Sequence, residues 1–381
     1  MKTRQYSFYF FPGCLLVLAG FLTALYLSVS HYRVYTDIVY SSFCAISKSI
    51  NCDTVSQSSF SVFLGMPVPI WGSIGYLFLI LLFPFLFHKK NTEKRLWSLF
   101  FCIVSLFFIY SLVLALISTF YIHSYCLMCI LSYAINFALM FYSYAVIKKF
   151  GDCGIWKGFF KDVSYLKFRS FPFPLLAKIF LAGVVLLWVF FPKYWVLDIK
   201  EGVVKPPSGV TEDGSHWIGA ENPEITIIEY TDYLCFQCKK MHFYLRSLVA
   251  ENPNKIRLVH RHFPLDKEFN FAIKEDLHSG AGKMAMLAIY AGLKDRFWEM
   301  NDLLFQIDHS KGTINLQELA QKINLKPEEL AWALDQKAIR LHLKRDIALG
   351  AKAGVTGTPS YIINDKLYLG TIPTNLLSMM R

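Results

Sequence analysis

The chain has 381 residues, which is enough for two domains. Hydrophobic residues make up 54% of it, above the roughly 45–50% of soluble domains, and the excess lies in the first half. The net charge of +11 comes largely from clusters between apolar runs, so it indicates a membrane topology rather than a nucleic-acid surface.

Four uncharged runs in the first half are longer than the roughly 20 residues that a helix needs to cross a bilayer. They are residues 7–30, 54–87, 96–122 and 124–147. A fifth run, residues 179–191, spans a bilayer only together with residues 173–177 and a snorkelling Lys178. We therefore predict a membrane domain of four transmembrane helices over residues 1–150, with a cytoplasmic loop and a fifth transmembrane helix over 151–192.

Basic residues gather in three places along this half and set the expected orientation, because such residues concentrate on the cytoplasmic side. They are Lys2 and Arg4, then Lys89, Lys90, Lys94 and Arg95, then Lys148, Lys149, Lys157, Lys161, Lys167, Arg169 and Lys178. The loop over residues 30–67 and the turn near His123 then lie outside, as does everything after the fifth span. The first apolar run is too long for a cleaved signal, and no small-residue cleavage site follows it.

Nine cysteines are present, and six of them form three close pairs on the predicted outer side. These pairs are Cys44 and Cys52, Cys126 and Cys129, and Cys235 and Cys238. Persistent disulfides belong to oxidising compartments outside the cytosol. Zinc is disfavoured because the two CxxC pairs lie in different domains without zinc-ribbon turns, so no metal site is predicted. A static structural disulfide remains an alternative for the first pair. The other three, Cys14, Cys102 and Cys153, are interpreted as small apolar residues or idle thiols.

The second pair begins an apolar span that also carries polar groups. Tyr133 lies one turn beyond Cys129, so both side chains are expected on one helix face. Polar groups at membrane depth are costly and are candidates for function. A dithiol beside a hydroxyl suits an apolar two-electron acceptor, such as a quinone dissolved in the bilayer. Upstream, residues 55–64 are predicted to form a short interfacial helix before Pro67 and Pro69 begin the second span.

With these residues identified, the region 8–148 resembles the vitamin K epoxide reductase family, in the bacterial form fused to a thioredoxin-like domain. The matching elements are the loop pair Cys44 and Cys52, Ser58, and the CLMC motif followed by the tyrosine of ILSYAIN. The resemblance implies a four-helix bundle around a quinone, with Cys129 nearest the quinone and Cys126 exchanging with the loop. Ser58 and Tyr133 would line or support the pocket. A capping role for Ser58 and an aromatic-belt role for Tyr133 stay open.

After a predicted linker over residues 193–216, the domain 217–381 is expected to be α/β. A β-branched strand over residues 225–230 leads into Cys235-Phe236-Gln237-Cys238 and a helix over 239–250. A helix N-terminus lowers the pKa of the first cysteine, and the second can resolve a mixed disulfide. A strand at 255–262, helical segments over 274–350 interrupted near 311–313 and 326–327, and a final strand at 360–363 complete the pattern.

This domain resembles the DsbA-like branch of the thioredoxin superfamily, through the strand, CFQC, the helical insertion and Thr358-Pro359. The resemblance implies a thioredoxin fold in which Cys235 reacts, Cys238 resolves, and Thr358 and a cis Pro359 face them and contact substrate. Better-known oxidising members carry a histidine between the cysteines where this chain has Phe-Gln, so the oxidising strength stays open. A nearby pair, His260 and His262, is interpreted as strand packing.

The predicted function is a quinone-linked thiol oxidase that forms disulfide bonds in exported proteins. Electrons would pass from reduced protein substrates through the thioredoxin-like domain and the membrane cysteines to ubiquinone or menaquinone. The expected location is a bacterial inner membrane, with the thioredoxin-like domain on the periplasmic side and no nucleic-acid partner. The alternatives are a membrane-fed isomerase or reductase, and an envelope chaperone whose thioredoxin fold only binds peptides. Literal epoxide reduction is suggested by the resemblance alone.

Overall fold

The computed structural model describes residues 8–47, 49–86, 96–150, 154–168, 173–197, 206–307 and 314–380. The chain divides into two compact units, Met1–Trp195 and Val196–Arg381. Part of the predicted cytoplasmic charge lies outside the described residues, as do the predicted helix break at 311–313 and one cysteine. The residues concerned are Lys2, Arg4, Lys89, Lys90, Lys94, Arg95, Arg169 and Cys153.

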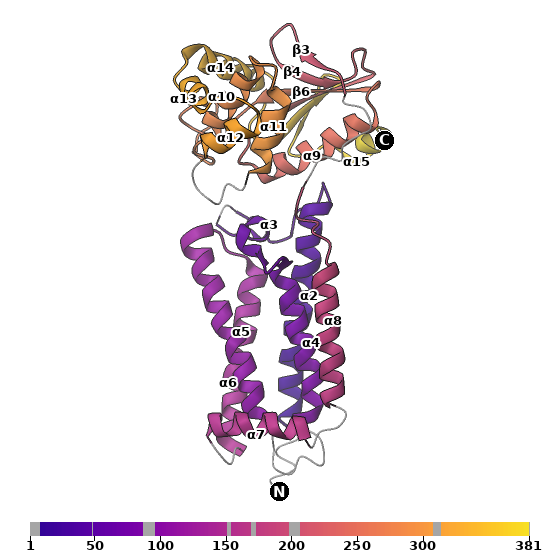
Figure 1. Cartoon of the computed structure of the whole chain (residues 1–381), viewed down its shortest axis with the longest axis vertical. Helices are drawn as coiled ribbons and strands as arrows, with labels where there is room; N and C mark the ends of the chain where they lie inside the picture. The colour runs from indigo at the N-terminus through magenta and orange to yellow at the C-terminus, as the bar shows by residue number, and fades with distance from the viewer. Residues whose placement is uncertain are drawn as a thin grey trace. The chain divides into compact units, whose positions relative to one another are not determined.

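Among the described residues of the first unit, five helices are long and apolar enough to cross a membrane. They are α2 (Phe10–Thr36), α4 (Val68–Leu86), α5 (Trp97–Ile117), α6 (Leu127–Phe150) and α8 (Phe173–Phe190), and they run along one another in Figure 1. A π-helical turn, η2 (Ser118–Ile122), continues α5. The expectation of five spans is confirmed, including the short fifth one, which takes in Lys178 as predicted.

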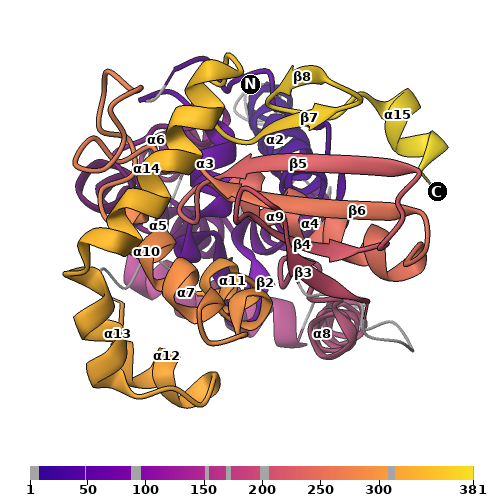
Figure 2. The same ribbon diagram turned by 90° about the horizontal axis from the view of Figure 1, so that it is seen from above.

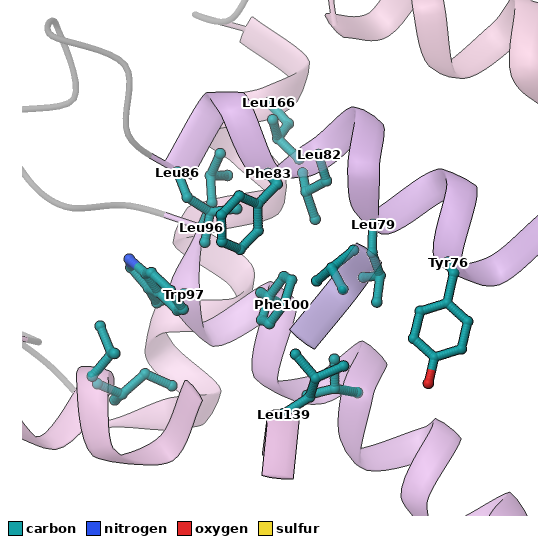
Figure 3. Close-up of a cluster of buried hydrophobic side chains, with 14 of the residues drawn as sticks. Tyr76, Leu79, Leu82, Phe83, Leu86, Leu96, Trp97, Phe100, Leu139 and Leu166 are labelled. Carbon is teal, nitrogen blue, oxygen red and sulfur yellow. The ribbon is translucent and has the colours of Figure 1, made fainter. Parts of the chain in front are cut away.

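The helices pack through large apolar side chains at one end of the bundle. Leu79, Phe83 and Leu86 of α4 meet Phe100 of α5 and Leu139 of α6, all of them buried (Figure 3). Elsewhere a glycine allows close approach between α2 and α4. A Cβ at Gly20 would lie 2.1 Å from the Tyr76 ring, so only glycine admits that ring there.

A charged amphipathic helix, α7 (Ile155–Phe168), links α6 to α8 and crosses the end of the bundle in Figure 1. Its Asp162 carboxylate accepts a hydrogen bond from the Leu99 backbone N–H at 3.0 Å, which fastens it to the first turns of α5. Trp156 and Phe160 remain exposed on its surface. These features fit a helix that lies along an interface rather than across a bilayer.

The segment before the second span differs from the prediction of one helix over 55–64. The helix α3 (Cys52–Gln57) starts earlier, because the side chain of Asn51 caps it, and it ends where Ser58 adopts an extended backbone. A short 3₁₀ turn, η1 (Ser59–Ser61), follows. The next residues form a small antiparallel hairpin of β1 (Val62–Phe63) and β2 (Met66–Pro67), and α4 then begins directly after Pro67.

The second unit is built on a six-stranded sheet of order β3-β4-β6-β5-β7-β8, which Figure 2 shows from above. The strands are β3 (Ser208–Val210), β4 (His216–Gly219), β5 (Ile225–Thr231), β6 (Ile256–His262), β7 (Ser360–Ile363) and β8 (Lys366–Leu369). Only β5 and β6 pair in parallel. Both β5 and β6 match the predicted strands to within one residue at either end.

Three strands of this sheet, β3, β4 and β8, were not predicted. β7 is not the last strand, because Asn364 and Asp365 both take positive φ and turn the chain back into β8, as a two-residue hairpin requires. Within the predicted linker, residues 208–210 pair with β4 through a turn at Gly214, whose φ is +80°. The linker expected over 193–216 therefore contains a strand.

Helices complete this α/β unit. α9 (Phe236–Glu251) follows β5, and the insertion after β6 contains α10 (Ala281–Gly292), α11 (Phe297–Gln306), α12 (Leu316–Lys322), α13 (Pro327–Leu334) and α14 (Lys337–Lys352). The predicted break at 326–327 is confirmed, because Pro327 occupies the first turn of α13. A last helix, α15 (Thr374–Met379), ends the chain. The Thr358–Pro359 peptide bond is cis, as predicted.

Candidate active site

Three cysteine sulfurs meet in one buried cluster of the membrane unit. Cys44 and Cys52 form a disulfide, and Cys126 carries a free thiol. Each of the three is at most 3% exposed, and Leu27 and Val55 pack against them. The Cys126 thiol therefore shares a water-poor pocket with the loop disulfide.

A short backbone bridge explains why these cysteines adjoin. The Asn51 N–H donates to the Tyr125 carbonyl at 2.9 Å, and the Tyr125 N–H donates to the Ser49 carbonyl at 2.8 Å. The bridge pairs Ile50 with Tyr125; Cys126 directly follows Tyr125, and Cys52 directly follows Asn51, which donates one of the two bridging hydrogen bonds. The register of the bridge thus fixes the approach of the loop to the start of α6.

The loop is tied to the N-terminus of α3 as well. The Asn51 side chain accepts hydrogen bonds from the N–H groups of Asp53 and Thr54, at 2.9 and 3.1 Å. The Asp53 carboxylate in turn accepts from the Ser42 N–H at 3.0 Å. Both arms of the disulfide loop are therefore held by hydrogen bonds near the sulfurs.

The CLMC pair occupies the beginning of α6. The Cys129 N–H donates to Cys126 Sγ at 3.1 Å, and the Ile130 N–H donates to the Cys126 carbonyl at 3.0 Å. Cys126 faces the loop disulfide, whereas Cys129 lines a cavity inside the bundle. One helical turn thus separates Cys126, which packs against the loop disulfide, from Cys129, which lines the cavity.

The cavity has a volume of about 510 Å³ and lies among α2, α4, α5 and α6, with a mostly apolar lining. Sites for small organic ligands typically occupy roughly 300–1,000 Å³. Besides Cys129, both Ser58 and Tyr133 line it. The Ser58 hydroxyl donates to the Val55 carbonyl at 2.7 Å, so Ser58 also closes the last turn of α3.

Several polar groups of the cavity were missed by the sequence analysis. The Tyr76 hydroxyl donates to Asn136 Oδ1 at 2.5 Å, and Asn136 Nδ2 donates to Ser111 Oγ at 2.8 Å. All three line the cavity, as do His31 and Ser61. Their signal in the sequence was the cost of polar side chains within apolar spans, which marks Asn136 and His31 most clearly.

The second cysteine pair lies at the start of α9 in the α/β unit. Cys235 caps the helix, and its Sγ accepts the Cys238 N–H at 3.3 Å. The Cys235 thiol also lies 3.6 Å from the carbonyl oxygen of Thr358, next to the cis Pro359. Cys238 is fully buried, whereas Cys235 is partly exposed. The fold thus brings together all four residues predicted for this site.

The pKa values of the two thiols of this pair are shifted in opposite directions. A hydrogen bond from the Cys238 thiol lowers the pKa of Cys235, and the backbone N–H of Cys238 acts in the same direction. Burial raises the pKa of Cys238 well above its ordinary value. Cys235 is therefore the thiol of this pair that ionises first, and Cys238 keeps its proton to higher pH.

Charged groups lie close to this pair. The buried Asp232 carboxylate accepts the Leu265 N–H at 2.6 Å and lies 3.1 Å from the His278 ring. Its negative charge raises the pKa of Cys235, and His278 lowers it.

His260 and His262 lie on β6, and both side chains are buried. The His260 ring bonds Glu229 at 2.8 Å, and burial lowers the pKa of His262 well below its ordinary value. Their positions agree with the packing role expected for them. Within the part of the chain that the structure describes, no group of three or more His, Cys, Asp or Glu side chains could hold a metal ion.

Two family models match the chain: the vitamin K epoxide reductase family over residues 12–144, and a DSBA-like thioredoxin domain over residues 226–379. Similar solved structures include a thioredoxin-like oxidoreductase from Silicibacter pomeroyi, with 23% identity over 45% of this chain and 91% of that one and a TM-score of 0.37. Another is Pseudomonas aeruginosa DsbA2, with 25% identity, 47% and 94% coverage, and a TM-score of 0.35.

Among curated proteins, a Na(+)/H(+) antiporter NhaA from Salinispora arenicola is 27% identical over 48% of this chain and 26% of its own length. The chain thus spans about a quarter of that relative. The disulfide bond formation protein D of Bacillus subtilis is 26% identical over 40% of this chain and 69% of its own length.

The paired cysteines at two helix N-termini, on a bundle of apolar helices and beside a thioredoxin-like sheet, together with these two family models indicate thiol–disulfide exchange chemistry. More specifically, the chain joins a domain of the vitamin K epoxide reductase family to a DsbA-like thioredoxin domain.

Proposed function

We propose that the protein is a quinone-linked thiol oxidase that forms disulfide bonds in exported proteins. The observation that carries this proposal is the arrangement of the membrane cysteines. The Cys44–Cys52 disulfide packs against the Cys126 thiol, and Cys129, one helical turn away, lines an apolar cavity. A disulfide buried against a free thiol is arranged for exchange. A cavity of this size and polarity suits the ring of a membrane quinone, with Ser58 and Tyr133 among its polar contacts.

The first exchange takes place in the DsbA-like domain. A substrate thiolate attacks Cys235 of the oxidised pair, and a second substrate thiolate releases Cys235 as a thiolate, which leaves the substrate disulfide-bonded. The lowered pKa of Cys235 makes it a good leaving group at this step. Thr358 and Pro359 lie beside Cys235, where a bound peptide would pair with the chain.

The reduced pair then passes its electrons to the membrane unit. Cys235 attacks Cys44, Cys238 resolves the adduct, and the loop is left with two thiols. Cys52 next attacks Cys126 of an oxidised CLMC pair and releases Cys129 as a thiolate, after which Cys44 reforms the loop disulfide and frees Cys126. Two electrons leave the reduced Cys126–Cys129 pair for the quinone, and that pair is a disulfide again.

The direction of this relay is set by the reduction potentials of its pairs. The rival function is a membrane-fed isomerase or reductase, which the Phe-Gln dipeptide of CFQC leaves open, since no histidine cation stabilises the Cys235 thiolate from within the motif. An oxidase requires the Cys235–Cys238 pair to have a higher reduction potential than the thiols of its substrates. Equilibration of the purified protein with glutathione buffers measures that potential.

We further propose a bacterial inner membrane, with the cysteine-rich end of the bundle and the DsbA-like domain on the periplasmic side. Lys148 and Lys149 lie in the last turn of α6, at the opposite end of that helix from Cys126, and Lys157 follows in α7, which supports a cytoplasmic location for that end. Ubiquinone and menaquinone are the acceptors expected there.

The test uses the full chain in detergent with a reduced unfolded protein and a soluble quinone analogue. Wild type is expected to reduce the quinone only when substrate is present, and Cys129→Ala is expected to lose this activity. Cys102→Ala, which removes a thiol from α5 outside the cavity lining, is the matched control and should behave as wild type. Thiol exchange without quinone reduction in wild type would overturn the oxidase assignment and favour the isomerase.

A further inference from the structure

One buried titratable side chain of the membrane unit has no part in the thiol relay. His31 lies on α2, five residues before that helix ends at Thr36, and it is fully buried. It also lines the cavity that contains Cys129. A polar ring at this depth is costly unless both of its nitrogens find partners.

Both ring nitrogens of His31 are hydrogen-bonded, in opposite directions. Nε2 lies 3.2 Å from Ser61 Oγ, and Nδ1 lies 2.9 Å from the hydroxyl oxygen of Tyr194. Ser61 lines the cavity too, whereas Tyr194 lies beyond the end of α8 and is partly exposed. The three side chains form a continuous line of exchangeable protons from the surface to the cavity.

Each member of this line is held in place by its own contacts. The Ser61 N–H donates to the Ser58 carbonyl at 2.9 Å within the 3₁₀ turn. The Tyr194 ring packs edge-on against Tyr32, with centroids 5.0 Å apart. The hairpin before α4 is tied to α8, because Trp188 Nε1 donates to the Leu64 carbonyl at 2.7 Å. The geometry is therefore set by the fold.

We propose that Tyr194, His31 and Ser61 form the path by which protons reach the cavity from the aqueous surface at this end of the bundle. The proposal rests on the proposed function, in which a quinone is reduced beside Cys129. Substrate thiols lose their protons in water when they become thiolates, so the two electrons arrive at the cavity without protons. Reduction of a quinone to a quinol takes up two protons with the two electrons, and an apolar cavity has to import them.

Imidazole is suited to this transfer, because it accepts a proton on one nitrogen and releases one from the other. A proton enters from the Tyr194 hydroxyl at Nδ1, and the proton on Nε2 passes through the Ser61 hydroxyl to a quinone oxygen. Tyr194 regains its proton from water, and a flip of the imidazole ring, which now carries its proton on Nδ1, together with rotation of the hydroxyls resets the line. No charge remains on the protein after each proton has passed.

The test compares steady-state quinone reduction by the full chain in detergent for His31→Gln, Tyr194→Phe and Tyr35→Phe. The Tyr35 ring lies 5.1 Å from His31, and its hydroxyl donates to the Ser56 carbonyl at 3.3 Å, outside the line. Tyr35→Phe therefore removes a neighbouring hydroxyl with the same change in shape as Tyr194→Phe. A fall in kcat on the order of 10- to 100-fold is expected for His31→Gln and Tyr194→Phe.

Two further readouts separate proton delivery from structural support. KM for the quinone should stay at the wild-type value, and the solvent deuterium isotope effect on kcat should rise in both variants. Tyr35→Phe should match wild type in both respects. Should His31→Gln unfold, Tyr194→Phe decides the matter, because it keeps the ring that packs at the end of α8.

An unchanged kcat and isotope effect in Tyr194→Phe would overturn the proton path, as would an equal loss in Tyr35→Phe. These results leave the proposed function standing, since wild type still reduces the quinone. Absence of quinone reduction in wild type would instead overturn the proposed function, and the proton path with it.

Discussion

The two CxxC pairs of this protein share one local structure in two different surroundings. In each pair the first cysteine stands at a helix N-terminus and its Sγ accepts the N–H of the second, at 3.1 Å for Cys126 and 3.3 Å for Cys235. The hydrogen bonds and the helix dipole act on the first sulfur in both units.

What differs is the partner that each sulfur can meet. Cys235 is partly exposed beside the Thr358 carbonyl, and its partner Cys238 is fully buried. In the membrane the first cysteine, Cys126, is the more deeply buried one and packs against a disulfide, while the second, Cys129, opens on an apolar cavity. The motif is the same in both units, and under the proposed function the surroundings direct one pair to protein thiols and the other to a small apolar acceptor.

The largest effect is expected from a substitution of Cys126, the cysteine of the CLMC pair that packs against the loop disulfide. Cys126→Ser should lower substrate-dependent quinone reduction by at least about 1,000-fold, because the loop thiols lose the disulfide they attack. Under turnover the loop cysteines should then accumulate as thiols, which alkylation and mass spectrometry detect. A Cys126→Ser protein whose loop reoxidises at the wild-type rate in the presence of quinone would contradict the assigned order.

The corresponding change in the α/β unit separates the nucleophile from the resolving thiol. Cys238→Ser keeps the partly exposed Cys235 but cannot resolve an adduct, so attack of Cys235 on a disulfide-bonded substrate should leave mixed disulfides that accumulate on non-reducing gels. Cys235→Ser should form none, although Cys238 is intact, because Cys238 is buried and keeps its proton. Equal trapping by both variants would show that burial does not decide which sulfur reacts.

A smaller effect concerns the charge next to Cys235. Because the pKa of Cys235 is lowered, its thiolate persists above that pKa, and alkylation slows as the pH falls through it. Asp232 raises this pKa through its negative charge, so Asp232→Asn should move the alkylation profile to lower pH. The rate of iodoacetamide reaction against pH measures it. Asp365→Asn, in the exposed β7–β8 turn, should leave the profile unchanged, and a shift to higher pH in Asp232→Asn would contradict the charge assignment.

The smallest effect concerns the support of the loop disulfide. Asn51→Ala removes the cap of α3 and should lower the free energy of unfolding by about 1 kcal/mol. Asn51→Asp keeps an acceptor for the same N–H groups and should retain most of the stability. Thermal unfolding of the two variants in one detergent compares them. Equal stability of Asn51→Ala and wild type would mean that the loop is held by the Tyr125 bridge alone.

The general plan of both units could be predicted from the sequence because each rests on a local pattern. Apolar runs longer than a bilayer is thick predicted four of the five long helices, and the shorter run at 179–191 predicted the fifth together with residues 173–177 and Lys178. A β-branched strand before a CxxC motif predicted the thioredoxin-like core. The cis bond at Pro359 was expected because Thr358-Pro359, directly before a strand, resembles the cis-proline loop of thioredoxin folds. These features depend on neighbouring residues only, so no long-range contact had to be known.

Features that depend on contacts between distant segments were missed. The bridge between Ile50 and Tyr125 joins two stretches without any strand pattern, and it is this bridge that brings Cys52 and Cys126 together. The polar lining from Tyr76 and Asn136 comes from two helices whose facing sides cannot be read from one helix alone. The strand β8 was overlooked because its turn is Asn-Asp rather than the commoner Asn-Gly.

The most direct measurement of the central claim is the stoichiometry of turnover. Purified full-length protein receives a limiting amount of reduced unfolded substrate and an excess of quinone, and both substrate disulfides and quinol are counted. The relay predicts one quinol for each disulfide formed, because both products arise from the same two electrons. Substrate disulfides that form without quinol in the absence of oxygen, or quinol that forms without disulfides, would contradict a single path from Cys235 to the cavity.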